Sequence, residues 1–244
     1  MDQYRPTGFR ILPPVVKNLI IINALFYLGT IAASQTFHID LADYLGLHYP
    51  VSSLFKPHQL VTYMFMHGSP AHILFNMFAV WMFGSTLENV WGPKRFLIFY
   101  MITGIGAGLI QLAVSYVQVT GLEAQLDPET ITMIRSEGLS IYQQGNYFTN
   151  PIVQKLNLLY NIPTVGASGS IFGLLLAFGM LFPNALIYLY FAIPIKAKYF
   201  VIGYGLIELF SGVANKPGDN VAHFAHLGGM LFGYFLIVLW KRRR

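Results

Sequence analysis

The sequence contains no cysteine, so it has no disulfide framework, no thiolate nucleophile and no cysteine-bound metal centre. Charged residues are also scarce: they make up 10% of the 244 residues, whereas a soluble domain carries about 25%. This shortage argues against an ordinary soluble domain. The 55% hydrophobic content and the mean hydropathy of +0.55 instead indicate a membrane protein with several spans.

The apolar segments predict an all-α membrane protein, a bundle of six transmembrane helices in a single domain over residues 1–244. We expect the helices over Val16–Ala33, Pro70–Val90, Phe96–Val117, Val165–Phe182, Ala197–Ala214 and Val221–Trp240. A short N-terminal segment, residues 1–15, and a basic C-terminus, residues 241–244, are expected to lie outside the bilayer.

Basic residues are distributed unequally between the two sides of the membrane that six spans define. Eleven of the 15 lysines and arginines fall on the side that holds both termini, and four fall on the other side. By the positive-inside rule, both termini are expected in the cytoplasm, with the protein in the plasma or inner membrane. The net charge of +5 therefore reflects membrane topology, and no nucleic-acid partner is expected.

Four polar side chains lie near the outer ends of three expected spans, although polar groups inside a bilayer are costly. Ser168 lies about 5 Å into the fourth span and His226 about 7 Å into the sixth, at a rise of about 1.5 Å per residue. His72 and Asn76 are four residues apart in the second span, so they share one helix face. Because all three spans begin on the outer side, we expect these groups in one layer.

Two glycine pairs accompany this layer. Gly169 and Gly173 form a GxxxG pair in the fourth span, and Gly229 and Gly233 form another in the sixth. Such pairs let helix backbones approach each other closely. The second pair follows His226 by three and seven residues, so it lies on the same helix face as the histidine.

These residues are suited to acyl transfer by an activated serine. His226 would act as the general base that takes the proton of the Ser168 hydroxyl. We see no carboxylate at the same depth, so the sequence predicts a Ser-His dyad without an acidic third member. Phe172 lies on the face of the serine and would stack on the imidazole. The oxyanion would be stabilised by the Ser168 backbone N–H and by the side chains of His72 and Asn76.

Structural and other functional interpretations compete with each part of this hypothesis. The serine alone could cap its helix, and the His72 and Asn76 side chains could join two helices. Four histidines, His67, His72, His223 and His226, could suggest a metal site, but no metalloprotease spacing accompanies them, and no metal is expected. Glu208, halfway along the fifth span, could be a proton-relay group or an acid bonded to a neighbouring helix.

Four stretches together resemble the rhomboid family of intramembrane serine proteases. They are HGSPAHILFNM from His67, GSTLENVWGPKRF from Gly84, GASGSIFG from Gly166 and AHFAHLGGMLFG from Ala222. The glycine spacing selects His226 over His223 as the family's histidine, and the resemblance covers the second through sixth spans.

The resemblance implies a six-helix bundle whose water-filled active site opens to the outer side. It implies cleavage of other proteins' transmembrane segments near their outer ends, with membrane lipid as surroundings and with no metal or cofactor. Gly166 would lie at the substrate-facing edge of the serine loop, and Gly169 would let backbone approach the nucleophile. Two alternatives remain open: a non-catalytic scaffold of the same fold that binds transmembrane helices, and a small-solute transporter or proton channel using Glu208.

Overall fold

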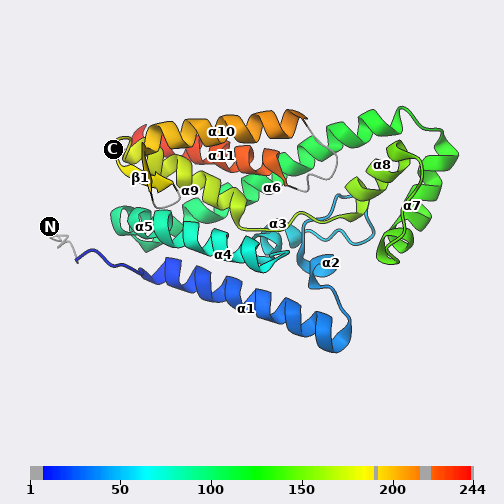
Figure 1. Ribbon diagram of the computed structural model, residues 1–244, viewed down its shortest axis with the longest axis horizontal. Helices are drawn as coiled ribbons and strands as arrows, with labels where there is room; N and C mark the ends of the chain where they lie inside the picture. The colour runs from blue at the N-terminus through cyan, green and yellow to red at the C-terminus, as the bar shows by residue number, and fades with distance from the viewer. Residues whose placement is uncertain (1–7, 190–191, 215–220, 243–244) are drawn as a thin grey trace.

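In a computed structural model, the described residues are 8–189, 192–214 and 221–242, and they are mostly helical (Figure 1). In chain order the elements are α1 (Pro14–Phe37), α2 (Leu41–Leu45), α3 (Gln59–Thr62), η1 (Tyr63–Phe65), α4 (Pro70–Ala79), η2 (Val80–Gly84), α5 (Ser85–Trp91), α6 (Pro93–Glu123), α7 (Pro128–Gln143), α8 (Pro151–Asn161), α9 (Ser168–Leu181), β1 (Leu186–Leu189), β2 (Ile193–Lys196), α10 (Ala197–Ala214) and α11 (His223–Arg242). The expected terminal segments extend into residues 1–7 and 243–244, which lie outside the described residues.

Within the described residues, four helices are long and apolar enough to cross a membrane: α1, α6, α10 and α11. Their outward faces carry large exposed apolar side chains, including Leu25 and Leu28 of α1 and Ile202 and Phe210 of α10. Water would disfavour such a surface, whereas lipid tails would not. These helices therefore have the surface of membrane-spanning segments.

The other two expected spans are present as helical segments of different form. The expected Pro70–Val90 helix is a continuous helical run through α4, η2 and α5, with η2 a π-helical turn in its middle. The expected Val165–Phe182 helix begins later, as the 14-residue α9. The count of six membrane spans therefore remains a prediction.

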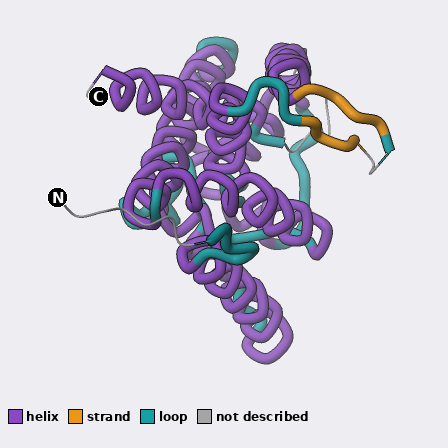
Figure 2. Tube along the Cα trace, turned by 90° about the vertical axis from the view of Figure 1, so that its left-hand side faces the viewer, coloured by secondary structure: helices purple, strands orange, loops and turns teal. Residues whose placement is uncertain are grey.

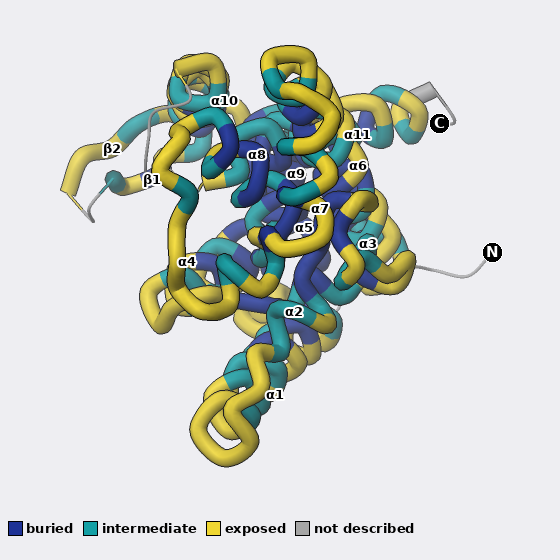
Figure 3. Tube along the Cα trace, turned by 90° about the vertical axis from the view of Figure 1, so that its right-hand side faces the viewer, coloured by how far each residue is buried: buried dark blue, intermediate teal, exposed yellow. Residues whose placement is uncertain are grey.

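The core of the bundle is centred on α9, which packs against α6 and α11. Nine of its 14 residues are buried, among them Gly169, Phe172 and Gly173. The buried segments gather in the middle of the molecule, and α1 lies at its edge with an exposed outer end (Figures 1 and 3). A helix surrounded in this way holds the first residue of α9, Ser168, in a fixed position.

The start of α1 is attached to α5 through a buried carboxylate. The Glu88 side chain accepts hydrogen bonds from the backbone N–H groups of Val15 at 3.0 Å and Val16 at 2.8 Å. It is 2% exposed. The first amides of a helix lack partners within the helix, so the carboxylate satisfies them and also favours the helix dipole.

An antiparallel hairpin joins α9 to α10, and the hydropathy pattern did not predict it. Strands β1 and β2 pair with Leu186 opposite Lys196, and Ala197 donates its N–H to the Ala185 carbonyl at 2.8 Å. The hairpin lies at the periphery of the helices (Figure 2). It fixes the point at which α10 begins, and therefore the depth of each α10 residue.

The long segment of residues 118–164 forms the end of α6 and two helices, α7 and α8. The sequence Asp127-Pro128-Glu129 is typical of a helix start, and Asp127 caps α7 by accepting the Thr130 N–H at 2.8 Å. A second cluster of buried apolar side chains lies here, and it includes Val119, Ile134 and Leu156. This cluster attaches the two helices to α6.

Candidate active site

Ser168 and His226 are in hydrogen-bond contact. Ser168 is the first residue of α9, and His226 lies in the first turn of α11. The serine Oγ is 2.8 Å from the histidine Nε2. His226 is buried, at 8% exposure of the residue. A serine hydroxyl beside the ring nitrogen of a buried histidine is the arrangement in which the ring can accept the hydroxyl proton.

The prediction that no carboxylate accompanies this pair is wrong. Glu208 of α10 lies 2.8 Å, through Oε2, from Nδ1 of His226, the ring nitrogen that does not face the serine. It is 5% exposed. The residues therefore form a chain of three groups, Ser168–His226–Glu208. The error arose because Glu208 lies halfway along its expected span, which would place it away from the outer layer.

A usable signal was present in the sequence. Helices α10 and α11 are consecutive and joined by a short connection, so residues at similar distances from that connection face each other. Glu208 lies six residues before the end of α10, and His226 lies three residues after the start of α11. The difference corresponds to about 4.5 Å of helix rise, which the long glutamate side chain spans.

His223 contacts the same carboxylate oxygen. Its Nδ1 is 2.6 Å from Oε2 of Glu208, and its ring lies edge-on to that of His226 with centroids 6.4 Å apart. Ligand atoms of Glu208, His223 and His226 all lie within 4.8 Å of one another, so these residues could hold a metal ion. The two hydrogen bonds to Oε2 explain this proximity, and the expectation of no metal remains a prediction.

An aromatic stack supports the imidazole on its face. The rings of Phe172 and His226 are 4.2 Å apart and 8° from parallel, so the expected contact is present. Tyr204 of α10 stacks on the far side of Phe172 at 5.2 Å. Stacking restricts rotation of the ring out of this plane, whereas the hydrogen bonds fix its orientation within the plane.

His72 and Asn76 lie on the α4 side of the serine. A Cβ built on Gly166 would lie 2.8 Å from His72 Nε2 and 3.6 Å from Ser168 Oγ, so the histidine and the serine flank one small space. The Nδ2 group of Asn76 is buried and has no hydrogen-bond partner among the described residues. A buried unpaired donor is costly, and a partner supplied by substrate would remove that cost.

Gly166→Ala tests whether this space is used. Gly166 has a φ of +127°, and an added Cβ would crowd His72. If the site cleaves transmembrane substrates, as the family resemblance implies, we expect that activity to fall by about 10²-fold, the cost of losing one oxyanion donor. Gly145→Ala is the matched control, since Gly145 also has a positive φ, +72°, but has open space around it. Equal losses of activity in both variants would contradict this role of the space.

Small residues bring α9 and α11 together. A Cβ on Gly229 would collide with the backbone carbonyl of Gly169, and one on Gly233 would lie 3.4 Å from the Gly173 Cα. The GxxxG pairs inferred from the sequence therefore face each other. Their contact sets the distance between the serine on α9 and the histidine on α11.

The Rhomboid domain family matches residues 55–243 of the chain. The chain belongs to the rhomboid family. The match contains every residue of the Ser168–His226–Glu208 chain and both candidate oxyanion residues. With the four apolar helices found in the described part of its chain, this rhomboid is an integral membrane protein.

Curated relatives are distant and mostly longer. The rhomboid is 27% identical over 191 residues to RHOMBOID-like protein 12, mitochondrial, of Arabidopsis thaliana. This alignment covers 77% of this chain and 46% of that protein. It is 25% identical to Rhomboid protein 1, mitochondrial, of Saccharomyces cerevisiae, over 74% of this chain and 42% of that protein. It is 23% identical to the rhomboid protease AarA of Providencia stuartii, over 72% of this chain and 53% of that protein. The chain thus spans about half the length of these relatives.

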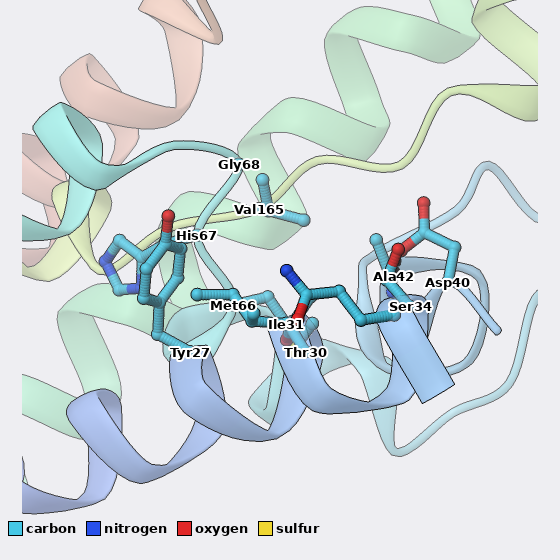
Figure 4. A pocket seen from close by; sticks show the side chains of 11 residues that line it. Tyr27, Thr30, Ile31, Ser34, Asp40, Ala42, Met66, His67, Gly68 and Val165 are labelled. Atoms are coloured by element: carbon cyan, nitrogen blue, oxygen red, sulfur yellow. Dashed lines mark hydrogen bonds between the residues drawn. The ribbon is translucent and has the colours of Figure 1, made fainter. Parts of the chain in front are cut away.

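A pocket of about 380 Å³ in the rhomboid adjoins the site without containing Ser168 or His226. It lies between α1 on one side and residues 66–68 on the other, with Val165 beside Gly68 (Figure 4). His67 connects the two regions, since it lines the pocket and its ring meets that of His72 edge-on at 4.9 Å. His67 therefore lies between the pocket and His72.

His67 makes the stability of the rhomboid depend on pH. Burial, together with the neighbouring His72, lowers the pKa of His67 from 6.5 to about 4. Between pH 6.5 and about 4, His67 binds a proton in the unfolded chain but stays neutral in the folded protein. The contribution of His67, about 3 kcal/mol, is therefore complete above pH 6.5 and is lost as the pH falls to about 4.

Thermal unfolding of the wild type and of His67→Gln between about pH 7.5 and 4 measures this contribution. We expect the melting temperature of the wild type to fall more steeply over that range. His48, whose pKa burial also lowers, is common to both proteins and cancels in the comparison. Parallel pH profiles would show that His67 does not titrate in this way.

Proposed function

We propose that this rhomboid is a serine endopeptidase that cleaves transmembrane segments of other membrane proteins near their outer ends. The observation that carries the proposal is the 2.8 Å contact between Ser168 Oγ and His226 Nε2, formed inside a bundle of apolar helices. Family membership supports it, and relatives such as AarA carry the name of protease. Both groups needed for nucleophilic attack are present and in contact.

In the proposed acylation step, Ser168 Oγ attacks the carbonyl carbon of the scissile peptide and its proton passes to His226 Nε2. The carbonyl oxygen becomes an oxyanion. It is stabilised by the Ser168 N–H, which has no partner within α9 because it is the first amide of the helix, and by His72 and Asn76. The C–N bond then breaks as His226 donates the proton to the leaving amine, and an acyl-enzyme ester forms.

Deacylation uses the same groups with water as the nucleophile. His226 takes a proton from the water, the hydroxide attacks the ester carbon, and a second oxyanion forms in the same place. Collapse of this intermediate returns the proton from His226 to Ser168 Oγ and releases a carboxylic acid product, which loses its own proton to water. The cycle is balanced without a metal or a cofactor, and none is proposed.

Substrate selection follows from the chemistry of a helix in a bilayer. A peptide bond inside a helix has its carbonyl hydrogen-bonded and shielded by neighbouring side chains, so the segment must unwind before attack. We expect a small or helix-breaking residue near the cleavage point. With six spans, both termini in the cytoplasm and the site open to the outer side of the plasma or inner membrane, cleavage falls near the outer end of the substrate.

Cleavage of a single-span model substrate in lipid vesicles tests the proposal. We expect two fragments, with the cut near the outer end of the substrate span. A scaffold of the same fold would bind the substrate helix and leave it intact. A transporter would instead move solute or protons in vesicles without producing fragments. Intact substrate across several sequences, with the protein folded, would reject the protease assignment.

A further inference from the structure

Glu208 is a buried carboxylate with an unusual environment. It is 5% exposed and lies in the apolar helix α10, where an ionised group is costly. Two histidine ring nitrogens lie within hydrogen-bond distance of its Oε2 atom, at 2.6 and 2.8 Å. The cost of burying a charge is offset only where the charge is paired and hydrogen-bonded. Here the partners are His223 and His226, and His226 is the residue that contacts Ser168.

We propose that Glu208 is a positioning residue for His226, so that this rhomboid acts through a Ser168–His226–Glu208 triad. The inference rests on the proposed protease function. One ring nitrogen of His226 faces the carboxylate at 2.8 Å and the other faces the serine hydroxyl at 2.8 Å. An ionised carboxylate only accepts hydrogen bonds, so it requires the proton of neutral His226 to reside on Nδ1. Nε2 then presents its lone pair to Ser168.

The carboxylate also stabilises the state that follows proton transfer. When His226 receives the serine proton on Nε2, the ring becomes an imidazolium, and its positive charge lies beside Oε2. No proton moves to Glu208, which remains ionised throughout. In serine hydrolases a carboxylate in this position orients the imidazole and stabilises its charged form in the same way.

Phe172 does not replace this interaction. It stacks on the face of His226 and restricts tilting, but it offers no acceptor for Nδ1. Without the carboxylate, the ring could carry its proton on Nε2 and present a donor to the serine. The stack would then hold an imidazole of the wrong tautomer in the right place.

His223 holds the carboxylate itself. Its Nδ1 lies 2.6 Å from the same oxygen that faces His226, so that oxygen is fixed from two directions. Both histidines come from the first turn of α11, and Glu208 comes from α10. The two contacts therefore connect the helices at the level of the nucleophile, and His223 limits the rotamers that Glu208 can adopt.

Glu208→Gln tests the triad in the full-length protein in lipid vesicles. The amide keeps the shape of the side chain and removes its charge. We expect kcat to fall by about 10²-fold or more while KM changes by less than about threefold. Labelling of Ser168 by a fluorophosphonate, which needs no substrate helix, should slow in parallel. Glu208→Asp keeps the charge on a side chain one methylene shorter, so its kcat should lie between that of Glu208→Gln and that of the wild type.

Glu88→Gln is the matched control. Glu88 is also a buried glutamate in a helix, but it accepts backbone N–H groups at the start of α1. We expect that variant to unfold at a lower temperature and to keep the wild-type kcat. A Glu208→Gln enzyme with wild-type kcat, or one whose loss matches its unfolded fraction, would overturn the triad. If the wild type itself neither cleaves substrate nor reacts with the fluorophosphonate, the protease function fails and the triad with it.

A second measurement examines the tautomer of His226 in the wild-type protein, with Glu208 unchanged. Nitrogen-15 NMR of histidine-labelled wild type distinguishes the two neutral tautomers, with the His226 signals assigned by their loss in His226→Ala. The triad predicts a proton on Nδ1 and none on Nε2 in the neutral ring. A neutral His226 with its proton on Nε2 would overturn it.

Discussion

Ser168→Ala should abolish cleavage, with a loss of about 10⁴-fold or more, while the protein remains folded. The substitution removes the one atom that attacks the substrate, and serine hydrolases lose activity on this scale when the nucleophile is removed. Alanine suits the first turn of α9, since it is a good helix former. His226→Ala should cause a loss of similar size because the base and the nucleophile act together. Initial rates at equal amounts of folded protein measure both effects.

Ser170→Ala is the matched control for the nucleophile. Ser170 lies two residues further along α9 and donates a hydrogen bond through Oγ to the Tyr100 carbonyl at 2.8 Å. Its loss should cost about 1 kcal/mol of stability and leave cleavage in place. Undiminished cleavage by Ser168→Ala, or equal losses in the two serine variants, would contradict the assignment of the nucleophile.

Gly229→Ala should also cause a large loss of activity, of about 10²-fold or more, although Gly229 takes no part in the chemistry. The added methyl group would collide with the Gly169 carbonyl, which is backbone and cannot rotate away. Helix α11 must then move from α9, and His226, three residues before Gly229, moves with it. The hydrogen bond between Ser168 and His226 would lengthen beyond the range that allows proton transfer.

Gly203→Ala provides the comparison for this packing effect. Gly203 lies inside α10, and a Cβ there would meet no atom within 4 Å. We expect normal cleavage and a stability change of at most about 1 kcal/mol, in the stabilising direction, because alanine favours the helix. If Gly229→Ala retained full cleavage, close contact between α9 and α11 would not be needed to align the site.

The contact between Ser168 and His226 could be predicted because it depends on features that the sequence displays directly. Successive apolar segments cross the membrane in alternating directions, so the sequence assigns Ser168 and His226 to the same side of it. The glycine pattern after His226 indicates which face of α11 meets α9. The start of α7 could also be predicted, because its cap needs only the Asp127 side chain and the backbone N–H of Thr130, three residues later.

The role of Glu208 was missed although the expected helix, Ala197–Ala214, has the same bounds as α10. Measured from the outer end of that helix, Glu208 lies about 9 Å deep, only slightly deeper than His226, and its long side chain spans the difference. Describing Glu208 as halfway along its span hid this comparison, and the hydrogen bond to His226 itself emerges only from the packed structure. The unpaired amide of Asn76 likewise emerges only from the packed structure.

The most direct measurement of the central claim is the site of covalent reaction with a fluorophosphonate. The wild-type protein is treated in lipid vesicles, and the modified residue is located by peptide mass mapping while substrate cleavage is followed in the same sample. The account predicts one adduct, on Ser168, that accumulates as cleavage is lost and does not form in His226→Ala. Complete loss of cleavage with Ser168 unmodified, or full cleavage with Ser168 fully modified, would contradict it.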